Sequence, residues 1–474
     1  MSNVSFVSFA HRPNAAGGAF YDYTARYGAV REEDRVTLRQ SMFPEEAGLI
    51  RDSIQSFVVD EVHNNVEDKE ERVRHFQEWV KNLGLQELLD LPLIALSNGQ
   101  TRRARIVKAL LKKPQVLLLD EPLTGLDVQT RSTLISLLHT LHKSCSPRVI
   151  MGLRMQDPIP EWISHLALVS SGRVRTGQKE EVLAEVEEDN KRARESPHFV
   201  GTDKSAVKEN PSKVLIDMRN VNVKYHERHA RVLKDINWTI CAGDRWHLQG
   251  ANGSGKTTLL SILTGDHPQS YTQRSPSSLT LFGTPRRSHA TTTLRTRIGV
   301  ISPELYNAWP RARDMSVWEA VATGFDGGFV PLGDRGLGVG LRGELSHEEL
   351  EWRERRLWNV LEALGPQTWG NEVKPESMEE FAYRKFSELP AGVQSMVLLM
   401  RALVGQPEIV LLDEVWAGMD ESMIAAARRY LKEGGGVDEE QGVVVISHWE
   451  EEVPWGSEEG VRRFRLENGI GREA

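Results

Sequence analysis

The stretch of sequence that decides the fold is residues 250–257, which read Gly-Ala-Asn-Gly-Ser-Gly-Lys-Thr. It fits the pattern G-x-x-x-x-G-K-[ST] in full. Residues 244–249 before it suit a buried strand, and residues 258–263 after it suit a helix. In this context glycines let backbone N–H groups turn toward phosphate oxygens, and the helix N-terminus adds a partial positive charge. The sequence therefore predicts a loop that binds nucleotide phosphates.

The last residues of this loop have distinct expected roles. Lys256 is expected to reach the β- and γ-phosphates of a nucleotide, and the hydroxyl of Thr257 to hold Mg²⁺. The alternative is a glycine-rich turn that only precedes a helix. The nucleotide-binding residues that the motif predicts are Gly250, Ala251, Asn252, Gly253, Ser254, Gly255, Lys256, Thr257 and Thr258.

Two apolar stretches further along the chain end in residues that can act on a phosphate. Residues 409–414 read Ile-Val-Leu-Leu-Asp-Glu, the pattern of a strand buried on both faces with two acids at its carboxyl end. We expect Asp413 to hold Mg²⁺ through water, and Glu414 to accept a proton from the attacking water. Residues 443–448 end in His448, for which we weigh a contact to the γ-phosphate against an ordinary surface histidine.

The chain contains an internal repeat. Residues 109–127 and 402–420 align without a gap at a constant offset of 293, which includes the Asp-Glu pair. Repeats of this kind predict repeated structure. We therefore expect two homologous α/β domains, at residues 1–175 and 213–474. Between them, residues 176–212 carry 15 charged side chains and the composition of a linker, part of which could form a solvated helix.

Three features are expected inside the second domain. Residues 214–240 alternate in polarity like a β-hairpin. Residues 324–343 contain eight glycines and one proline, which predicts a long flexible loop. A helix is expected to start at Ser346, with Glu349 placed to complete a capping box.

Composition narrows the class of protein. The net charge of −8 argues against a protein whose main partner is a nucleic-acid backbone. Cys145 and Cys241 form no CxxC pair, which fits a reducing compartment. No apolar run approaches the roughly 20 residues that span a bilayer, so a membrane role needs a partner chain. Residues 1–21 lack acids, as organelle transit peptides do, although residues 6–9 also suit a strand. We expect a cytoplasmic protein, with a mitochondrial one as the alternative.

Taken together, the motifs resemble those of the ATP-binding cassette (ABC) ATPases, which use ATP and Mg²⁺. Besides the phosphate loop, the resemblance rests on Asp413-Glu414, Gly418-Met419-Asp420, His448 and an LSGGQ-like signature at Leu96–Gln100. The continuation Thr101–Arg105, without membrane spans, looks most like cytosolic tandem ABC proteins of the molybdenum-uptake and photorepair type. The resemblance implies two P-loop NTPase domains of the α/β class in tandem.

In this family the ATP lies between two domains, so each site takes residues from both. The resemblance implies one nearly complete site, in which the loop of domain two faces the signature of domain one. Domain one would supply Ser97, Gly99 and Gln100 of the signature and also Asp127. Tyr225 matches the aromatic residue that stacks on adenine, although a role in a strand core is equally open.

The other composite site is expected to be damaged. No phosphate loop precedes Leu96, so domain one is expected to be incomplete at its N-terminus. The second signature aligns with residues 389–393, where Pro390 removes a hydroxyl and an N–H donor. Arg154 aligns with His448, so the first domain also lacks that histidine.

The better site departs from the family in one respect. The glutamine that the family carries after the strand at residues 297–304 is missing. Ser302 or Glu304 could take its place near the metal. The missing residue weakens the case for tight coupling to a permease.

Several functions remain open at this stage. The leading hypothesis is Mg-dependent ATP hydrolysis at one composite site, with closure of the domains transmitted to an unknown partner. The alternatives are a nucleotide-dependent interaction module without hydrolysis, and the ATPase subunit of a transporter whose membrane part is a separate chain. The mixed-charge linker and the net charge oppose an ABC-type translation factor.

Overall fold

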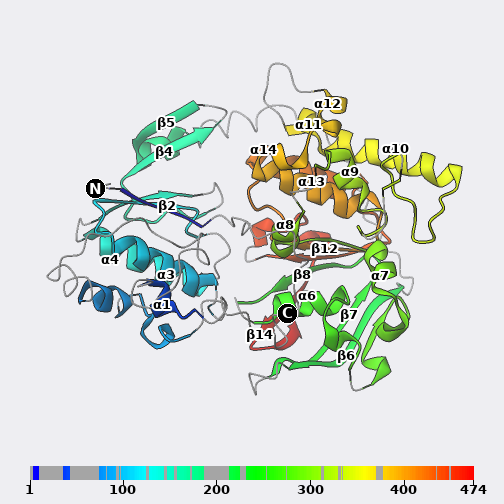
Figure 1. The fold of residues 1–474 in the computed structure, drawn as a ribbon, viewed down its shortest axis with the longest axis horizontal. Coiled ribbons are helices and arrows are strands. Elements are labelled where there is room, and N and C mark those ends of the chain that lie inside the picture. Colours follow the sequence, from blue (N-terminus) through cyan, green and yellow to red (C-terminus); the bar gives the residue numbers. More distant parts are fainter. Residues whose placement is uncertain are drawn as a thin grey trace.

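The structure is a computed structural model with two lobes of mixed α/β composition (Figure 1), residues 4–185 forming one and residues 213–474 the other. It describes residues 4–9, 36–42, 74–81, 83–91, 96, 98–123, 128–143, 147–153, 157–170, 173–185, 213–224, 231–251, 254–273, 275–310, 314–328, 332–333, 335–369, 377–433, 435–447 and 450–474. The α/β class predicted for both halves is confirmed.

A six-stranded sheet forms the centre of the C-terminal half. Its order is β11-β12-β13-β8-β14-β15, and every pair is parallel except β14 and β15. All residues of β12 and β13 are buried, as their continuous apolar sequence predicts. The strands are β8 (Arg245–Gln249), β11 (Ile298–Ile301), β12 (Ile409–Asp413), β13 (Gly442–Ile446), β14 (Arg462–Glu467) and β15 (Ile470–Glu473).

An antiparallel sheet covers one face of this central sheet. Its order is β10-β9-β6-β7, and β6 and β7 form the predicted hairpin. Trp238 of β7 stacks on Phe464 of β14 with ring centroids 4.3 Å apart, so the two sheets share one apolar core with the helix α6. The elements are β6 (Val214–Lys224), β7 (Arg231–Cys241), β9 (Leu279–Leu281), β10 (Thr284–Pro285) and α6 (Lys256–Leu263).

Helices cover the opposite face of the central sheet and form a second core with it. They are α9 (Val317–Ala322), α10 (His347–Leu364), α11 (Pro366–Trp369), α12 (Met378–Tyr383), α13 (Ala391–Val404) and α14 (Glu421–Glu433). Two short helices flank β11: α7 (Thr291–Arg297) and α8 (Pro303–Ala308). Single turns of 3₁₀ helix occur at Pro268–Ser270, Pro276–Ser278, Arg286–Ser288, Phe386–Glu388, Glu450–Glu452 and Ser457–Glu459.

The glycine-rich segment after α9 is a loop but is tied to the core. Its described residues form turns, bends and irregular backbone. Asp326 is buried and accepts hydrogen bonds from the guanidinium of Arg353 in α10, at 2.9 Å, and from the N–H of Gly340. The expected flexibility is therefore restricted in this part of the loop. At the start of α10, Ser346 caps the backbone of Glu349, but the Glu349 carboxylate pairs with Arg353 instead of closing a capping box.

The N-terminal half contains a smaller version of the same central sheet. β1 (Val4–Ser8), β2 (Val116–Asp120) and β3 (Arg148–Gly152) are parallel in the order β1-β2-β3, and β4 (His165–Ser170) pairs with β5 (Arg173–Gln178) in a separate hairpin. Helices α1 (Leu38–Met42), α3 (Asn98–Leu110) and α4 (Val128–Lys143), with helical residues 74–81, pack on one face. Further helical residues at 179–185 lie within the predicted linker.

The first strand bears on the two interpretations of the N-terminus. Residues 6–9 lie in or directly after β1, which pairs with β2 along its whole length. The strand interpretation of these residues is confirmed. The domain limits at residues 175 and 213 remain predictions.

Candidate functional site

The predicted phosphate loop lies between β8 and α6, so its strand and its helix are both present. Gly255 has φ of 109° at the start of α6, a backbone conformation that side chains rarely adopt. A Cβ at Gly250 would lie 2.5 Å from the carbonyl oxygen of Leu466 and 2.6 Å from the Ser254 hydroxyl. Both positions therefore require glycine, because the loop turns tightly against β14 before it enters the helix.

The donors of the loop fit an anion with several oxygens. The Lys256 ammonium donates to the carbonyl oxygens of Gly250 at 2.6 Å and Ala251 at 3.2 Å, so it lies over the loop. The Ser254 hydroxyl is buried and has no hydrogen-bond partner among the described residues. Phosphate oxygens would accept from this hydroxyl, from the ammonium and from the first N–H groups of α6. Asn252 and Gly253 lie outside the described residues.

The acids follow at the carboxyl edge of the same sheet. Asp413 ends β12 and is buried, and Glu414 follows with φ of 46° and donates its N–H to Ile446 at 3.0 Å. Burial, and then the nearby charges of Glu414 and Glu304, raise the pKa of Asp413 well above its usual range, although Lys256 opposes this rise. A cation beside Asp413 would favour its ionised form.

The residues present fit Mg²⁺ bound together with a nucleotide. Among the described residues, no group of three or more acidic, histidine or cysteine side chains is arranged to hold a metal alone. Mg²⁺ usually takes one or two protein ligands and completes its shell with phosphate oxygens and water. Asp413 and the hydroxyl of Thr257, on α6, supply ligands of that kind.

Ser302 and Glu304, the two residues predicted to replace the missing glutamine, have different surroundings in the structure. The Ser302 hydroxyl caps α8 by accepting from the N–H of Leu305 at 3.1 Å, so it serves the helix. Glu304 lies in the first turn of α8, and its Oε2 atom is buried without a hydrogen-bond partner in the described structure. The charge of Glu304 is one of the causes that raise the pKa of Asp413.

The strand before the loop contains a buried histidine, His247, that the sequence motifs did not predict. The ring of His247 in β8 accepts from the side-chain amide of Gln249 at 3.1 Å through Nδ1, and its Nε2 lies 3.0 Å from the Ser447 hydroxyl. Burial lowers the pKa of His247, which favours the neutral ring. The only signal in the sequence was a histidine between the apolar residues Trp246 and Leu248 of this strand.

The signature of the N-terminal half begins a helix, as expected. Helix α3 starts at Asn98, and Gln100 lies in its first turn. Arg102, one residue further than the first turn, donates to the carbonyl oxygens of Glu121 at 2.9 Å and Pro122 at 3.2 Å. This arginine thus ties the start of the signature helix to the turn that follows β2.

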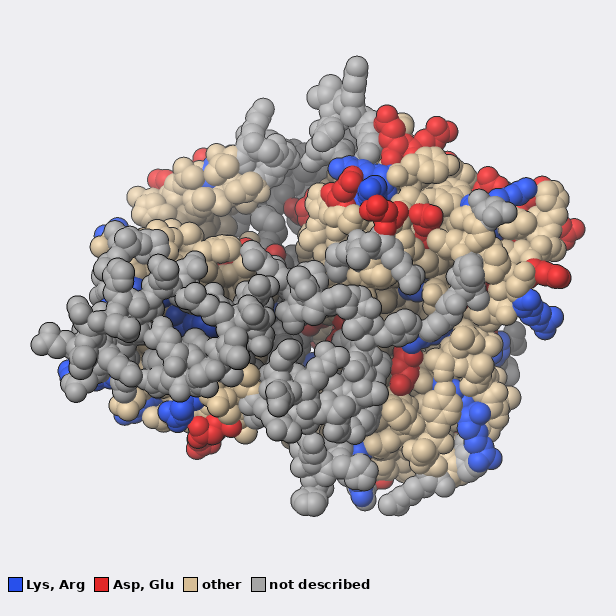
Figure 2. All heavy atoms as spheres, in the orientation of Figure 1, with Lys and Arg blue, Asp and Glu red and all other residues tan. Residues whose placement is uncertain are grey.

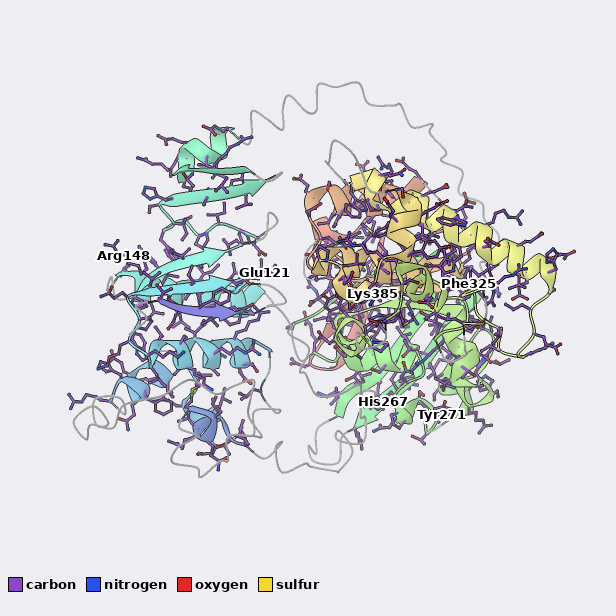
Figure 3. The ribbon with its side chains drawn as sticks, turned by 45° about the horizontal axis from the view of Figure 1, so that its top comes forward. Glu121, Arg148, His267, Tyr271, Phe325 and Lys385 are labelled. Atoms are coloured by element: carbon purple, nitrogen blue, oxygen red, sulfur yellow. The ribbon has the colours of Figure 1, made fainter. Side chains whose placement is uncertain are left out.

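The acid turn of the N-terminal half has the same form as its counterpart. Glu121 has φ of 50° and donates its N–H to Gly152 at 2.9 Å. The Asp120 carboxylate accepts from the Ser8 hydroxyl at 3.2 Å. Figure 3 shows Glu121 at the end of the N-terminal sheet opposite to Arg148, the first residue of β3.

At the position of the second signature, residues 389–393, the helix α13 begins. Pro390 is the N-cap of α13 and makes no side-chain hydrogen bond there. A Cβ at Gly392 would lie 2.2 Å from the carbonyl oxygen of Gly418, so the turn after Trp416 packs closely on this helix start.

Several predicted site residues lie outside the described residues: Ser97, Asp127, Arg154, Tyr225 and His448.

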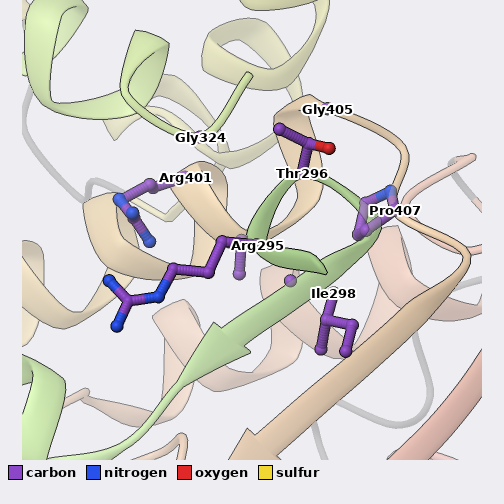
Figure 4. A pocket seen from close by; sticks show the side chains of 9 residues that line it. Arg295, Thr296, Ile298, Gly324, Arg401, Gly405 and Pro407 are labelled. Carbon is purple, nitrogen blue, oxygen red and sulfur yellow. The ribbon is translucent and has the colours of Figure 1, made fainter. Parts of the chain in front are cut away.

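A small hollow at the opposite edge of the sheet is not part of this site. It is lined at the amino ends of β11 and β12 by residues that include Ile298, Pro407 and the side chains of Arg295 and Arg401 (Figure 4). The phosphate loop and the acids lie at the carboxyl ends of the strands.

Among the described residues, no helix has the length and apolar character to cross a bilayer.

Comparisons with known proteins agree with this geometry. The family described as ABC transporter matches residues 21–124 and 233–417. An uncharacterized ABC transporter ATP-binding protein of Schizosaccharomyces pombe is 33% identical over 84% of this chain and 73% of its own length. One of Saccharomyces cerevisiae is 28% identical over 91% of this chain and 78% of its own.

The chain is also similar to a bacterial protein and to a solved structure. The ABC transporter ATP-binding protein ModF of Escherichia coli is 28% identical over 88% of this chain and 83% of its own length. A solved structure of an RNase-L inhibitor shares the fold at 17% identity, with a TM-score of 0.51 over 86% of this chain and 70% of that one. The chain belongs to the ABC ATP-binding family and carries two of its cassettes in tandem.

Proposed function

We propose that this chain binds ATP with Mg²⁺ at one composite site between its halves and hydrolyses it, and that closure of the halves is transmitted to a protein partner. The observation that carries the proposal is an asymmetry. The C-terminal half holds the strand and the helix on either side of the phosphate loop, next to Asp413 and Glu414, whereas the helix start with the better signature is α3 of the N-terminal half.

The C-terminal half would bind the nucleotide and the cation. The N–H groups of the loop and Lys256 would hold the β- and γ-phosphates, Tyr225 would stack on adenine, and Thr257 and Asp413 would hold Mg²⁺. When bound, Mg²⁺ neutralises charge on the phosphate oxygens. Glu414 would accept a proton from the attacking water, and His448 would contact the γ-phosphate.

The N-terminal half would close the site. Ser97, Gly99 and Gln100 at the start of α3 would bring a hydroxyl and backbone N–H groups to the γ-phosphate, and Asp127 would lie beside them. Because these contacts require both halves, ATP would favour the closed arrangement and phosphate release would relax it.

A matched pair of variants tests the shared site. Ser97→Arg is expected to lower phosphate release about tenfold or more, a loss of ~1.4 kcal/mol of transition-state stabilisation, with nucleotide still bound by the loop. Pro390→Arg introduces the same side chain at the aligned, exposed position of the other half and is expected to leave the rate unchanged. Equal effects, or none for Ser97→Arg, would refute the shared site.

Each alternative function predicts a different experimental result. A module that binds nucleotide without hydrolysis is favoured by Glu304 in place of the family's glutamine, and it would show ATP-dependent closure with no phosphate release. If the chain is a transporter subunit, its ATPase activity would be stimulated only when its membrane chain is present. Basic and acidic side chains are interspersed over α10 to α12 on the face in Figure 2, in keeping with no direct nucleic-acid partner. We place the protein in the cytoplasm, with the mitochondrion as the alternative.

A further inference from the structure

The parallel pairing of β8 with β13 ends one residue before the phosphate loop. The last paired residues are Leu248 and Ile446. The next residue on each strand leads into the candidate site, because Gln249 precedes Gly250 of the loop and Ser447 follows directly after β13. The regular ladder between the two strands therefore does not extend to Gln249 and Ser447, although the structure describes both residues.

The imidazole ring of His247 bridges these two strand ends. Its Nδ1 lies 3.1 Å from the side-chain amide nitrogen of Gln249, and its Nε2 lies 3.0 Å from the hydroxyl and 3.3 Å from the carbonyl oxygen of Ser447. The ring is buried, and its neutral form, with one donor and one acceptor, fits these partners. The ring is thus a short cross-link between the ends of β8 and β13.

Each of the linked strand ends supports one part of the candidate site. At the end of β8, the carbonyl oxygen of Gly250 accepts from the Lys256 ammonium at 2.6 Å. At the end of β13, the carbonyl oxygen of Ile446 accepts from the N–H of Glu414 at 3.0 Å. The positive φ of Glu414, 46°, is unfavourable for a residue with a side chain, so its turn depends on this support. A change in the distance between the strand ends would therefore move Glu414 relative to Lys256.

Packing alone does not account for a histidine at this position. His247 lies opposite Val445 of β13, which belongs to the core that the sheet forms with the helices. An apolar side chain at position 247 would fill the same space without binding Gln249 or Ser447. A buried polar ring is unfavourable unless its nitrogens have partners, and both nitrogens of His247 have them.

We propose that His247 is a positioning residue for the ATP hydrolysis proposed above, on which this inference rests. Its ring keeps the phosphate loop and the turn of Glu414 at a fixed separation, so that the acid stays beside the attacking water. Misplacement of a group by about 1 Å can lower a rate by about 10²-fold. The loop would still hold the phosphates, so loss of the ring is expected to lower kcat more than it raises KM.

The test compares three variants of the full-length chain. His247→Leu removes both hydrogen bonds of the ring and is expected to lower kcat for phosphate release about tenfold or more, with KM changed about threefold or less. His247→Gln keeps a donor for Ser447 and is expected to recover most of the rate. Val443→Ala, at a fully buried residue near the amino end of β13, is the control for lost packing and should keep the wild-type kcat. Circular dichroism checks that all three variants fold.

Hydrogen exchange of the nucleotide-free chain measures the same link without any turnover. In His247→Leu the N–H of Glu414 is expected to exchange about tenfold faster than in the wild type, because its acceptor strand is held less firmly. In His247→Gln and Val443→Ala this N–H should exchange at close to the wild-type rate.

The outcomes distinguish this inference from the proposed function. If the wild type releases phosphate but His247→Leu has an unchanged kcat, or Val443→Ala lowers kcat as much, the inference is overturned and the proposed function stands. If the wild type releases no phosphate, the proposed function is wrong, and the exchange of the Glu414 N–H decides the role of the ring. Faster exchange in His247→Leu then supports the link, and unchanged exchange overturns it.

Discussion

The two halves of the molecule form the same acid turn in different surroundings. Glu121 and Glu414 both follow a strand with positive φ, of 50° and 46°, and both donate their N–H across to the next strand. Yet every residue of β12 is buried, whereas β2 alternates between buried and half-buried residues. The turn therefore depends on the pairing of two neighbouring strands, and the phosphate loop with its antiparallel sheet is a separate layer added to them.

The largest expected difference between the halves is catalytic. Glu414→Gln is expected to lower phosphate release by about 10²–10⁴-fold, because an amide cannot accept the proton of the attacking water. Nucleotide binding should persist, since the loop is unchanged. Glu121→Gln makes the same change in the turn that lacks a described phosphate loop and should alter the rate less than about twofold, within the scatter of surface substitutions.

Phosphate release and binding of a fluorescent ATP analogue, measured on both variants, check this comparison. If Glu121→Gln proved as damaging as Glu414→Gln, both acid turns would act on nucleotide, and the asymmetry on which the proposed function rests would be wrong.

A second comparison concerns packing. Leu411 in β12 is fully buried in the core that includes α6, and Leu118 is its counterpart in β2, where it is half-buried. Leu411→Ala is expected to cost about 2–5 kcal/mol of the free energy of unfolding, because it leaves a cavity. Leu118→Ala should cost less, about 1 kcal/mol, because its surroundings already expose part of the side chain.

Chemical denaturation of the two variants, followed by tryptophan fluorescence, measures both changes. Equal costs would mean that the N-terminal sheet is covered on this face in solution.

The sequence predicts the layers that depend on local patterns and fails where the result depends on partners far along the chain. The repeat, the phosphate loop, the hairpin β6-β7 and the helix after Ser346 follow from spacing and capping rules. The exposure of Ile150 does not, because Val-Ile-Met has the same apolar pattern whether one face or both are covered. The tie between Asp326 and Arg353 is equally invisible in a run of glycines.

The candidate site shows the same division. The motif identifies Lys256, Asp413 and Glu414 because each follows a recognisable strand or loop. The bond between His247 and Ser447 joins residues 200 positions apart and could not be predicted from either stretch. The roles of Tyr225 and His448 stay predictions.

The smallest expected difference is a dependence on pH confined to the C-terminal half. His247 accepts from Gln249 through Nδ1, so its neutral form carries the proton on Nε2, toward Ser447. Burial lowers the pKa of this histidine below its unfolded value of about 6.5. The unfolded chain therefore binds the proton first. The stability that His247 contributes is complete above pH 6.5 and is lost as the pH falls from there toward the lower, folded pKa.

Melting temperatures at pH 7, 6 and 5 should fall less in His247→Gln than in the wild type. The exposed His165→Gln of the N-terminal half is the control and should keep the wild-type slope. A slope unchanged in His247→Gln would assign the acid sensitivity to other groups.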